Sequence, residues 1–296
     1  MKDAVNGILL LDKPGGLTSN AALQQAKRLL KARKAGHTGS LDPMATGLLP
    51  LCFGEGTKVS KFLLEADKQY WTTLRLGQET TTGDAEGEVV AEAEVTVTES
   101  DVRGILERFT GQIEQVPSVY SALKKGGEPL YKKARRGEEV EAPQPRSVHI
   151  HRLELLSLEG GFLELDILCS KGTYVRTLAT DIGRELGCLA HLAGLRRTAS
   201  GPFRVSDAVS LETLQAESLE ERRARVLPVD SALEGLPPVE LGETAAYYLV
   251  QGQPVMVPKA PEAPFLRLYD QSGRFLGVGS TLPDGRVTPK RLFHLP

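Results

Sequence analysis

A change of hydrophobic period between residues 163 and 189 constrains the fold of this chain more than any other feature. Four apolar residues occupy every second position, Leu163, Leu165, Ile167 and Cys169, and they alternate with Glu164 and Asp166 over the first part of the run. This alternation predicts a strand with one buried face. After Gly172, four apolar residues recur at helical spacing: Leu178, Ile182, Leu186 and Leu189. They predict a helix with Gly187 near its end.

Other segments predict further strands and helices around the same core. Gly160-Gly161 predicts a hairpin between the run 148–158 and the strand at 163–169. Residues 7–12 predict a short buried strand, and residues 70–76 predict another. Thr18 or Ser19 can cap a helix, and Gly36 is the expected stop for it. Strands and helices without regular βαβ alternation favour an α+β fold, with a mixed, largely antiparallel sheet and flanking helices.

The chain of 296 residues predicts one large domain and a smaller one. The prolines after Leu236 resemble a linker, which divides a domain at 1–235 from a small β domain at 238–296. Residues 207–235 are expected to be helical and charged. Residues 117–147 lack a clean period and are rich in Lys, Arg, Gly and Pro. A long irregular insertion in a compact domain is usually functional, so we interpret it as a loop that grips RNA.

Charge is segregated along the chain although the net charge is only −2. Two stretches are rich in cations: Lys27, Arg28, Lys31, Arg33 and Lys34, then Lys124, Lys125, Lys132, Lys133, Arg135 and Arg136. The segment 84–101 has seven acids and no cation. This pattern suits one face that binds a polyanion and another that repels it. Solvated helix faces would also explain such runs.

The cysteines and the N-terminus indicate a compartment. Cys52, Cys169 and Cys188 lie far apart without C-x-x-C spacing, which argues against a zinc module or a disulfide framework. We therefore expect a reducing, cytoplasmic compartment. The apolar run at residues 8–11 is too short for a signal peptide or a membrane span, and we expect no membrane association.

Asp42 is the leading candidate for a catalytic carboxylate. It lies between Gly39 and Gly47 in the otherwise small and apolar segment 37–50. An Asp-Pro pair often caps a helix, which is the structural alternative. In a tight loop that lines a pocket, the carboxylate could instead act as nucleophile or general base if a cation held it ionised. Arg176, at the predicted strand-to-helix junction, is the best candidate for that cation, although a surface arginine is equally compatible.

Other candidates have strong structural alternatives. Tyr70 and Tyr174 are compatible with core tyrosines or with stacking on a base. His37 is compatible with a general base or, more simply, with a loop position. His149 and His151 would share one face of a strand, but no third ligand is near in sequence, so we expect no metal site.

Several motifs in order make the chain resemble the TruB family of bacterial tRNA pseudouridine-55 synthases. The similarity runs from about Gly7 to Arg197 and more loosely to the C-terminus. The motifs are G-x-L-L-L-D-K-P-x-G-x-x-S at 7–19, G-H-T-G-S-L-D-P-x-A-T-G-x-L-P at 36–50, K-x-Y at 68–70, S-A-L-K at 121–124, C-S-K-G-T-Y-V-R at 169–176 and L-R-R at 195–197. Thr81 departs from the pattern, because many relatives carry Asp there.

The resemblance implies a role for each candidate. Asp42 would attack either the uracil ring or the ribose of uridine 55, and both remain open. Arg176 would pair with Asp42, and Tyr70 would stack on the flipped base. Tyr174 and Leu195 would complete the pocket wall. His37 would fill the space that the flipped nucleotides vacate.

The resemblance also implies the architecture and the partners. It implies the pseudouridine-synthase fold, an RNA-clamping insertion at 119–137, and a PUA-like C-terminal domain that contacts tRNA. The expected partner is the T-arm of tRNA, bound by a monomer that has no obligate protein partner. The isomerisation adds no outside group, so we expect neither a cofactor nor a metal.

Three alternatives remain open at this level. The first is a pseudouridine synthase that acts on another RNA, including guide-directed relatives. The second is an RNA-folding chaperone. The third is a carboxylate hydrolase, which would need a second acid near Asp42, and no nearby residue stands out.

Overall fold

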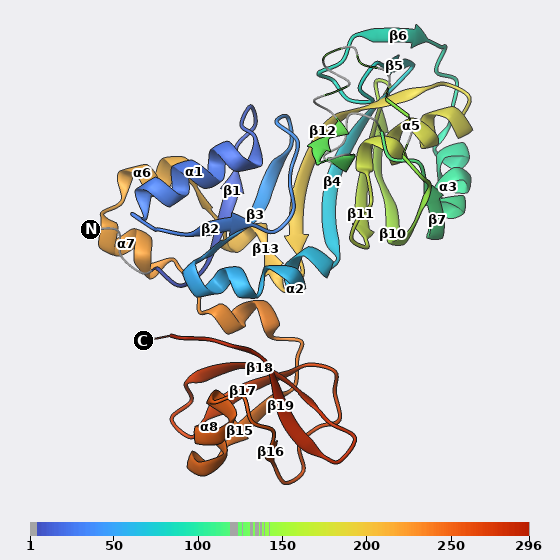
Figure 1. Ribbon diagram of the computed structural model, residues 1–296. Helices are drawn as coiled ribbons and strands as arrows, with labels where there is room; N and C mark the ends of the chain where they lie inside the picture. The colour runs from blue at the N-terminus through green and yellow to red at the C-terminus, as the bar shows by residue number, and fades with distance from the viewer. Residues whose placement is uncertain are drawn as a thin grey trace.

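The computed structural model describes residues 5–118, 124–125, 127–130, 133, 136, 138, 140–141 and 143–295. Figure 1 shows a larger part built on a long sheet and a smaller β part that contains the C-terminus. The predicted insertion at 119–137 and the S-A-L-K motif lie mainly outside the described residues. Among the described residues, no helix has the length and the apolar composition needed to cross a membrane.

A sheet of ten strands, counted over the described residues, forms the centre of the larger part. Its main order is β14-β1-β3-β12-β4-β11-β10-β7, with β2 paired to β3 and β13 paired to β12. The strands are β1 Gly7–Lys13, β2 Ala35–His37, β3 Thr46–Phe53, β4 Lys68–Leu76, β7 Gly111–Gln115, β10 Arg146–Glu159, β11 Phe162–Cys169, β12 Ala190–Ser200, β13 Phe203–Arg204 and β14 Val209–Ser210. Only the β1–β14 and β12–β3 pairs are parallel, so the predicted mixed, largely antiparallel sheet is confirmed.

Two short hairpins lie outside this sheet: β5 Gln78–Thr80 with β6 Val89–Glu92, and β8 Lys124–Lys125 with β9 Glu128–Pro129. The helices of the larger part are α1 Ser19–Leu29, α2 Ser60–Glu65, α3 Glu99–Arg108, α5 Val175–Glu185, α6 Leu211–Ala216 and α7 Leu219–Ala224. Three 3₁₀ segments accompany them: η1 Gly54–Lys58, η2 Val205–Asp207 and η3 Val229–Leu233. Helices α1 and α6 pack on β1 and β3 through one core cluster, while α3 and α5 pack on the β4–β11–β10 half through another.

The structure confirms most of the predicted elements and corrects two boundaries. The strands predicted near residues 7, 70 and 163 are present, and β10 and β11 form the predicted hairpin. Thr18 caps α1, because its hydroxyl accepts a hydrogen bond from the Ala21 amide at 3.1 Å. The prediction that Gly36 stops this helix is wrong, since the helix ends at Leu29 and Gly36 lies in β2.

The second correction concerns the end of α5. Leu189 does not extend the helical stripe, because α5 ends at Glu185 and Leu189 has a left-handed φ of 61°. The chain turns there to enter β12. A side chain at Gly183 would lie 2.2 Å from the Ala190 amide, so this glycine lets α5 pack closely on β12. This close packing fixes the start of α5 relative to the centre of the sheet.

The smaller part is a curled five-stranded sheet with one helix. Its strand order is β15-β17-β18-β19-β16. The elements are β15 Pro238–Leu241, α8 Glu243–Val250, β16 Val255–Met256, β17 Leu266–Asp270, β18 Phe275–Thr281 and β19 Arg286–Leu292. The expected small C-terminal β fold is therefore present.

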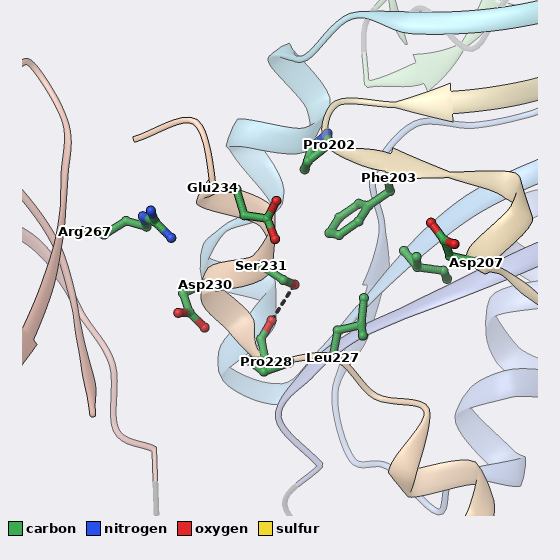
Figure 2. Close-up of a pocket in the computed structure, with 10 residues that line it drawn as sticks. Pro202, Phe203, Asp207, Leu227, Pro228, Asp230, Ser231, Glu234 and Arg267 are labelled. Carbon is green, nitrogen blue, oxygen red and sulfur yellow. Dashed lines mark hydrogen bonds between the residues drawn. The ribbon is translucent and has the colours of Figure 1, made fainter. Parts of the chain in front are cut away.

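The two parts share a hydrophobic cluster. Phe275, Val278 and Phe293 of the smaller part pack with Leu63 of α2 and Val229 of η3. Polar contacts reinforce this packing, because the Tyr269 hydroxyl donates to the Asp230 carboxylate at 2.6 Å and Lys58 Nζ donates to the Leu292 carbonyl at 2.9 Å. Figure 2 shows a pocket of about 570 Å³ beside this junction, with Arg267 of β17 on one side and Phe203 of β13 on the other.

Candidate active site

The loop between β2 and β3 carries Asp42 and is held in place by hydrogen bonds to Ser19, Lys13 and Gly16 rather than by a helix. The Ser19 hydroxyl donates to the Leu41 carbonyl at 3.0 Å and accepts from the Leu41 amide at 2.7 Å. The Lys13 ammonium donates to the carbonyl of Pro43 at 3.3 Å, and the Gly16 amide donates to the same carbonyl at 2.8 Å. The loop is therefore fixed on both sides of Asp42, and the helix-cap alternative for the Asp-Pro pair is excluded by the observed loop.

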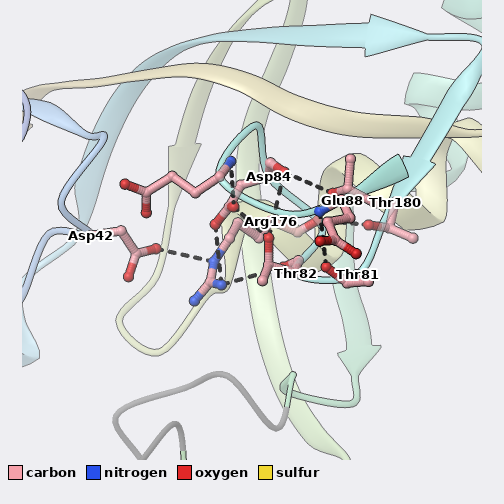
Figure 3. A network of polar contacts seen from close by, with 9 residues as sticks. Asp42, Thr81, Thr82, Asp84, Glu88, Arg176 and Thr180 are labelled. Carbon is pink, nitrogen blue, oxygen red and sulfur yellow. Dashed lines mark hydrogen bonds and ion pairs between the residues drawn. The ribbon is translucent and has the colours of Figure 1, made fainter. Parts of the chain in front are cut away.

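Arg176 lies at the start of α5 and joins two carboxylates from distant segments. Its Nε lies 3.0 Å from Asp42 Oδ2, and its Nη1 lies 3.3 Å from Asp84 Oδ2. Nη1 also donates to the Thr82 carbonyl at 3.3 Å. Figure 3 shows the guanidinium between Asp42 and the loop that carries Asp84. The side chains of Arg176 and Asp84 are 10% and 4% exposed, whereas that of Asp42 is 41% exposed and open to a ligand.

Asp84 corrects two predictions. The segment 84–101 was expected to form a face that repels polyanions, but its first residue is buried. Asp84 Oδ1 accepts hydrogen bonds from the Thr82 hydroxyl at 2.6 Å and from the Glu86 amide at 3.1 Å. The expectation that no second acid lies near Asp42 is also wrong, because Asp84 reaches the site across Arg176. Thr81 lies at the end of this network away from Asp42 (Figure 3), where its hydroxyl accepts a hydrogen bond from the Glu88 amide at 3.2 Å.

The electrostatic environment of Asp42 opposes its ionisation. Burial raises its pKa, the charge of Arg176 lowers it, the charge of Asp84 raises it and the charge of Lys13 lowers it, and the net pKa is raised. Burial also lowers the pKa of Lys13 to about 8. The charges of Arg176 and Lys13 thus oppose this rise and favour the ionised carboxylate that a nucleophile or general base requires.

A pocket of about 370 Å³ opens in front of Asp42. The predicted residues Asp42, Arg176, Tyr70, Tyr174 and Leu195 all line it, so the fold brings five of the six candidates together. This volume falls in the range of small-ligand sites.

His37 is the exception. It lies on β2, opposite Leu51 of β3, and does not line the pocket. Its Nδ1 is buried and has no hydrogen-bond partner within the described part of the chain. Burial and then the charge of Arg197 lower its pKa, so the imidazole is neutral at pH 7.

Four charged residues at or behind the pocket were not predicted as site residues: Lys13, Lys68, Asp84 and Arg197. Lys68 and Arg197 line the pocket while being almost fully buried. Lys13, Lys68 and Arg197 lie inside quoted motifs, which is the signal that could have indicated them, whereas Asp84 lies in none. Their burial depends on contacts between distant strands and cannot be read from local sequence.

No metal site accompanies this arrangement. Within the described ranges, no group of three or more His, Cys, Asp or Glu side chains is placed to hold an ion. His149 and His151 do lie together, with ring centroids 4.7 Å apart, and His151 Nε2 lies 3.2 Å from Asp67 Oδ2.

The fold is that of pseudouridine synthases. The chain resembles solved protein chains in a "Cbf5-Nop10-Gar1 Complex" (TM-score 0.75, 25% identity, 98% of this chain and 86% of that one) and, in fold, in an "H/ACA RNP bound to a substrate RNA containing 2'-deoxyuridine" (TM-score 0.75, 24% identity, 99% and 86%). Residues 27–175 match "TruB family pseudouridylate synthase (N terminal domain)".

The rest of the chain matches the same family. Residues 176–234 match "tRNA pseudouridylate synthase B C-terminal domain", and residues 237–293 match "Pseudouridine synthase II TruB, C-terminal". Proteins named tRNA pseudouridine synthase B are 56% identical in Stutzerimonas stutzeri (98% of this chain, 96% of the relative) and 56% identical in Pseudomonas aeruginosa strain UCBPP-PA14 (99% and 98%). The chain belongs to the TruB family of pseudouridylate synthases, which isomerise uridine to pseudouridine.

Proposed function

We propose that the protein isomerises uridine 55 in the T-loop of tRNA, with Asp42 as the catalytic carboxylate. The names of the 56% identical relatives support tRNA as the substrate class. The single observation that carries the chemistry is the contact of 3.0 Å between Asp42 and Arg176 at a pocket lined by Tyr70. A carboxylate held by a buried guanidinium next to an aromatic wall suits attack on a stacked base or on its sugar.

The reaction exchanges one glycosidic bond for another within the same nucleotide. Asp42 attacks the uracil ring or the ribose, and the bond from C1′ to N1 breaks. The base rotates so that C5 bonds to C1′, and the bond to Asp42 breaks, which restores the carboxylate. C5 then loses its proton while N1 gains one. Atoms and electrons balance without an outside reactant.

The pocket requires that the base leave the RNA stack. Flipping a base out costs a few kcal/mol. Stacking on Tyr70, with Tyr174 and Leu195 as the remaining wall, would return about 1–3 kcal/mol. The neutral imidazole of His37 can enter the space left in the loop without a desolvation penalty for charge.

The remaining parts of the chain have proposed RNA-binding roles. We assign catalysis to residues 1–235, including the clamp at 119–137, and additional tRNA contact to the PUA-like unit at 238–296. The basic run that starts at Lys27 lies at the C-terminal end of α1 and beyond it, and its last four cations are exposed. We propose that the protein works in the cytoplasm as a monomer without an obligate protein partner.

A second candidate function is isomerisation of a different RNA within an assembly. The solved chains of similar fold belong to complexes with other proteins or with RNA, as their descriptions state. The basic runs of this chain favour direct tRNA binding. A pure RNA chaperone is disfavoured by a complete carboxylate–guanidinium pair.

The test is tritium release from C5-labelled uridine in unmodified tRNA, with the modified position mapped by sequencing. Asp42→Asn should lower the rate at least about 1,000-fold, or about 4 kcal/mol in barrier, and should still bind tRNA. Asp284→Asn, which changes an exposed carboxylate on the turn before β19, is the matched control and should keep the wild-type rate. Wild-type release from a uridine other than 55 would replace the proposed target. Equal release by wild type and Asp42→Asn would refute the role of Asp42.

A further inference from the structure

Arg197 is a buried cation of the pocket that the proposed chemistry leaves without a role. It lies on β12 with 1% of its surface exposed, and it is the largest fully buried side chain among the described residues. It forms no salt bridge within the described part of the chain. Burying a charge without a carboxylate partner lowers the stability of the folded protein. A purely structural function therefore does not readily explain an arginine at this position.

The guanidinium of Arg197 binds two separate segments and lies beside a third. Its Nε donates to the Leu48 carbonyl of β3 at 2.6 Å. Its Nη2 donates to the Gly39 carbonyl at 3.1 Å, three residues before Asp42. Its direct strand partner is Tyr70 of β4, and both residues line the pocket. One rigid planar group therefore binds the loop that carries Asp42 and lies next to the aromatic residue of the pocket wall.

The register of the strands places Arg197 next to Tyr70 and β3. Arg197 is the direct antiparallel partner of Tyr70 and the parallel partner of Gly47. Directly opposed residues of neighbouring antiparallel strands project to the same face, so Arg197 and Tyr70 must lie side by side. A side chain at Gly47 would come within 2.3 Å of the Arg197 carbonyl oxygen, so this glycine permits the close approach of β3 and β12.

The charge of Arg197 acts on Tyr70 and on the basic groups around it, but not on Asp42. Burial raises the pKa of the Tyr70 phenol, and the charge of Arg197 opposes this rise. By contrast, Arg176 and Lys13 act on Asp42. The site thus has separate cations for its carboxylate and for its phenol.

We propose that Arg197 is a positioning residue for the isomerisation, holding the Tyr70 side chain beside it and the Gly39 end of the Asp42 loop at once. It thereby holds the aromatic wall and the carboxylate at a set separation while the base rotates between them. This inference rests on the proposed roles of Asp42 and Tyr70. Lysine at this position keeps the charge, but a single ammonium lacks the planar fork that binds the Leu48 and Gly39 carbonyls and lies beside Tyr70.

A double-mutant cycle tests the inference. Arg197→Lys should lower the single-turnover tritium release about 10- to 100-fold, the range expected for a misplacement of about 1 Å. Affinity for tRNA should change less than about threefold, since the residue does not face the RNA backbone. In the Tyr70→Phe background the same substitution should have an effect at least about fivefold smaller, because the hydroxyl is already absent. Arg196→Lys is the matched control, because the adjacent arginine pairs with Asp12 at 2.7 Å outside the pocket.

A second measurement does not depend on turnover. In protein labelled at the tyrosine ζ carbon, the Tyr70 resonance, assigned by its loss in Tyr70→Phe, should shift in Arg197→Lys and stay unchanged in Arg196→Lys. An unshifted resonance, equal rate losses in both backgrounds, or a fall in melting temperature and tRNA affinity that parallels the rate would each overturn the inference. The assay counts tritium released from every uridine of the tRNA. If the enzyme modifies a uridine other than 55, the sequencing map will show this, and the rates of the double-mutant cycle can still be compared.

Discussion

Substitutions at Arg176 and Asp84 should separate the effect of this ion-pair network on stability from its effect on catalytic activity. The first variant is Arg176→Met. At 3.3 Å and an effective dielectric constant of about 20, the attraction between Arg176 and Asp84 is about 5 kcal/mol. Without the cation, Asp84 remains an almost fully buried anion. It keeps the hydrogen bonds from Thr82 and Glu86, which offset part of this loss. Asp42 is partly exposed and can be rehydrated. We therefore expect Arg176→Met to lower the free energy of unfolding by about 3 kcal/mol at pH 7.

The double variant Arg176→Met/Asp84→Asn gives the decisive comparison. It removes the stranded charge and should recover at least about 2 kcal/mol, while tritium release stays as low as in the single variant because Asp42 has lost its cation. Arg184→Met is the matched control on the same helix. Its exposed pair with Glu79, at 2.6 Å, should contribute less than about 1 kcal/mol.

Urea unfolding followed by circular dichroism measures these free energies, and single-turnover tritium release measures the activity. The reasoning is refuted if Arg176→Met lowers stability by less than about 1 kcal/mol, or if the double variant is no more stable than the single one. Recovery of activity in the double variant would show that Asp84, rather than the missing cation, limits Asp42.

Three further outcomes follow from the same contacts. The folded state raises the pKa of Asp42, so the stabilising contribution of its protonated form is lost as pH rises through the folded pKa. Asp42→Asn should therefore raise the melting temperature at pH 7 by about 1–2 °C. This gain should vanish below pH ~4. Gly47→Ala should lower the free energy of unfolding by about 2 kcal/mol more than Gly16→Ala, since both have a left-handed φ but only Gly47 would clash with β12; equal losses in urea unfolding would contradict this. Tyr269→Phe removes the hydrogen bond to Asp230 and should lower the melting temperature by about 3–5 °C, with no further loss when combined with Asp230→Asn; an additive loss in calorimetry would argue against this contact.

The sequence predicted correctly those strands and helices whose buried face is set by the spacing of their own apolar residues. The alternation in β11 and the cap at Thr18 place a strand and a helix start correctly, because period and capping are short-range properties. The prediction that the helix ends at Gly36 was wrong because the end of the helix depends on a distant segment. The helix ends at Leu29, and the chain then forms β2, which pairs with β3.

The residues of the candidate site also fall into those that the sequence predicted and those that it did not. Asp42 and Arg176 were predicted because each lies in a distinctive motif at a loop or junction. Asp84 was assigned to an exposed acidic face, since nothing in its neighbours indicates that its loop folds beneath α5.

The sequence by itself determined the class of fold, the family motifs and the candidates Asp42 and Arg176, because periodicity, turn residues and motif spacing are local. Tertiary structure alone decided which buried charges meet. Strand pairing brings Arg197 into the pocket, and it brings Lys13 and Asp84 close enough for their charges to act on Asp42. Long-range register and desolvation depend on every strand of the sheet at once, and no single segment of the chain encodes them.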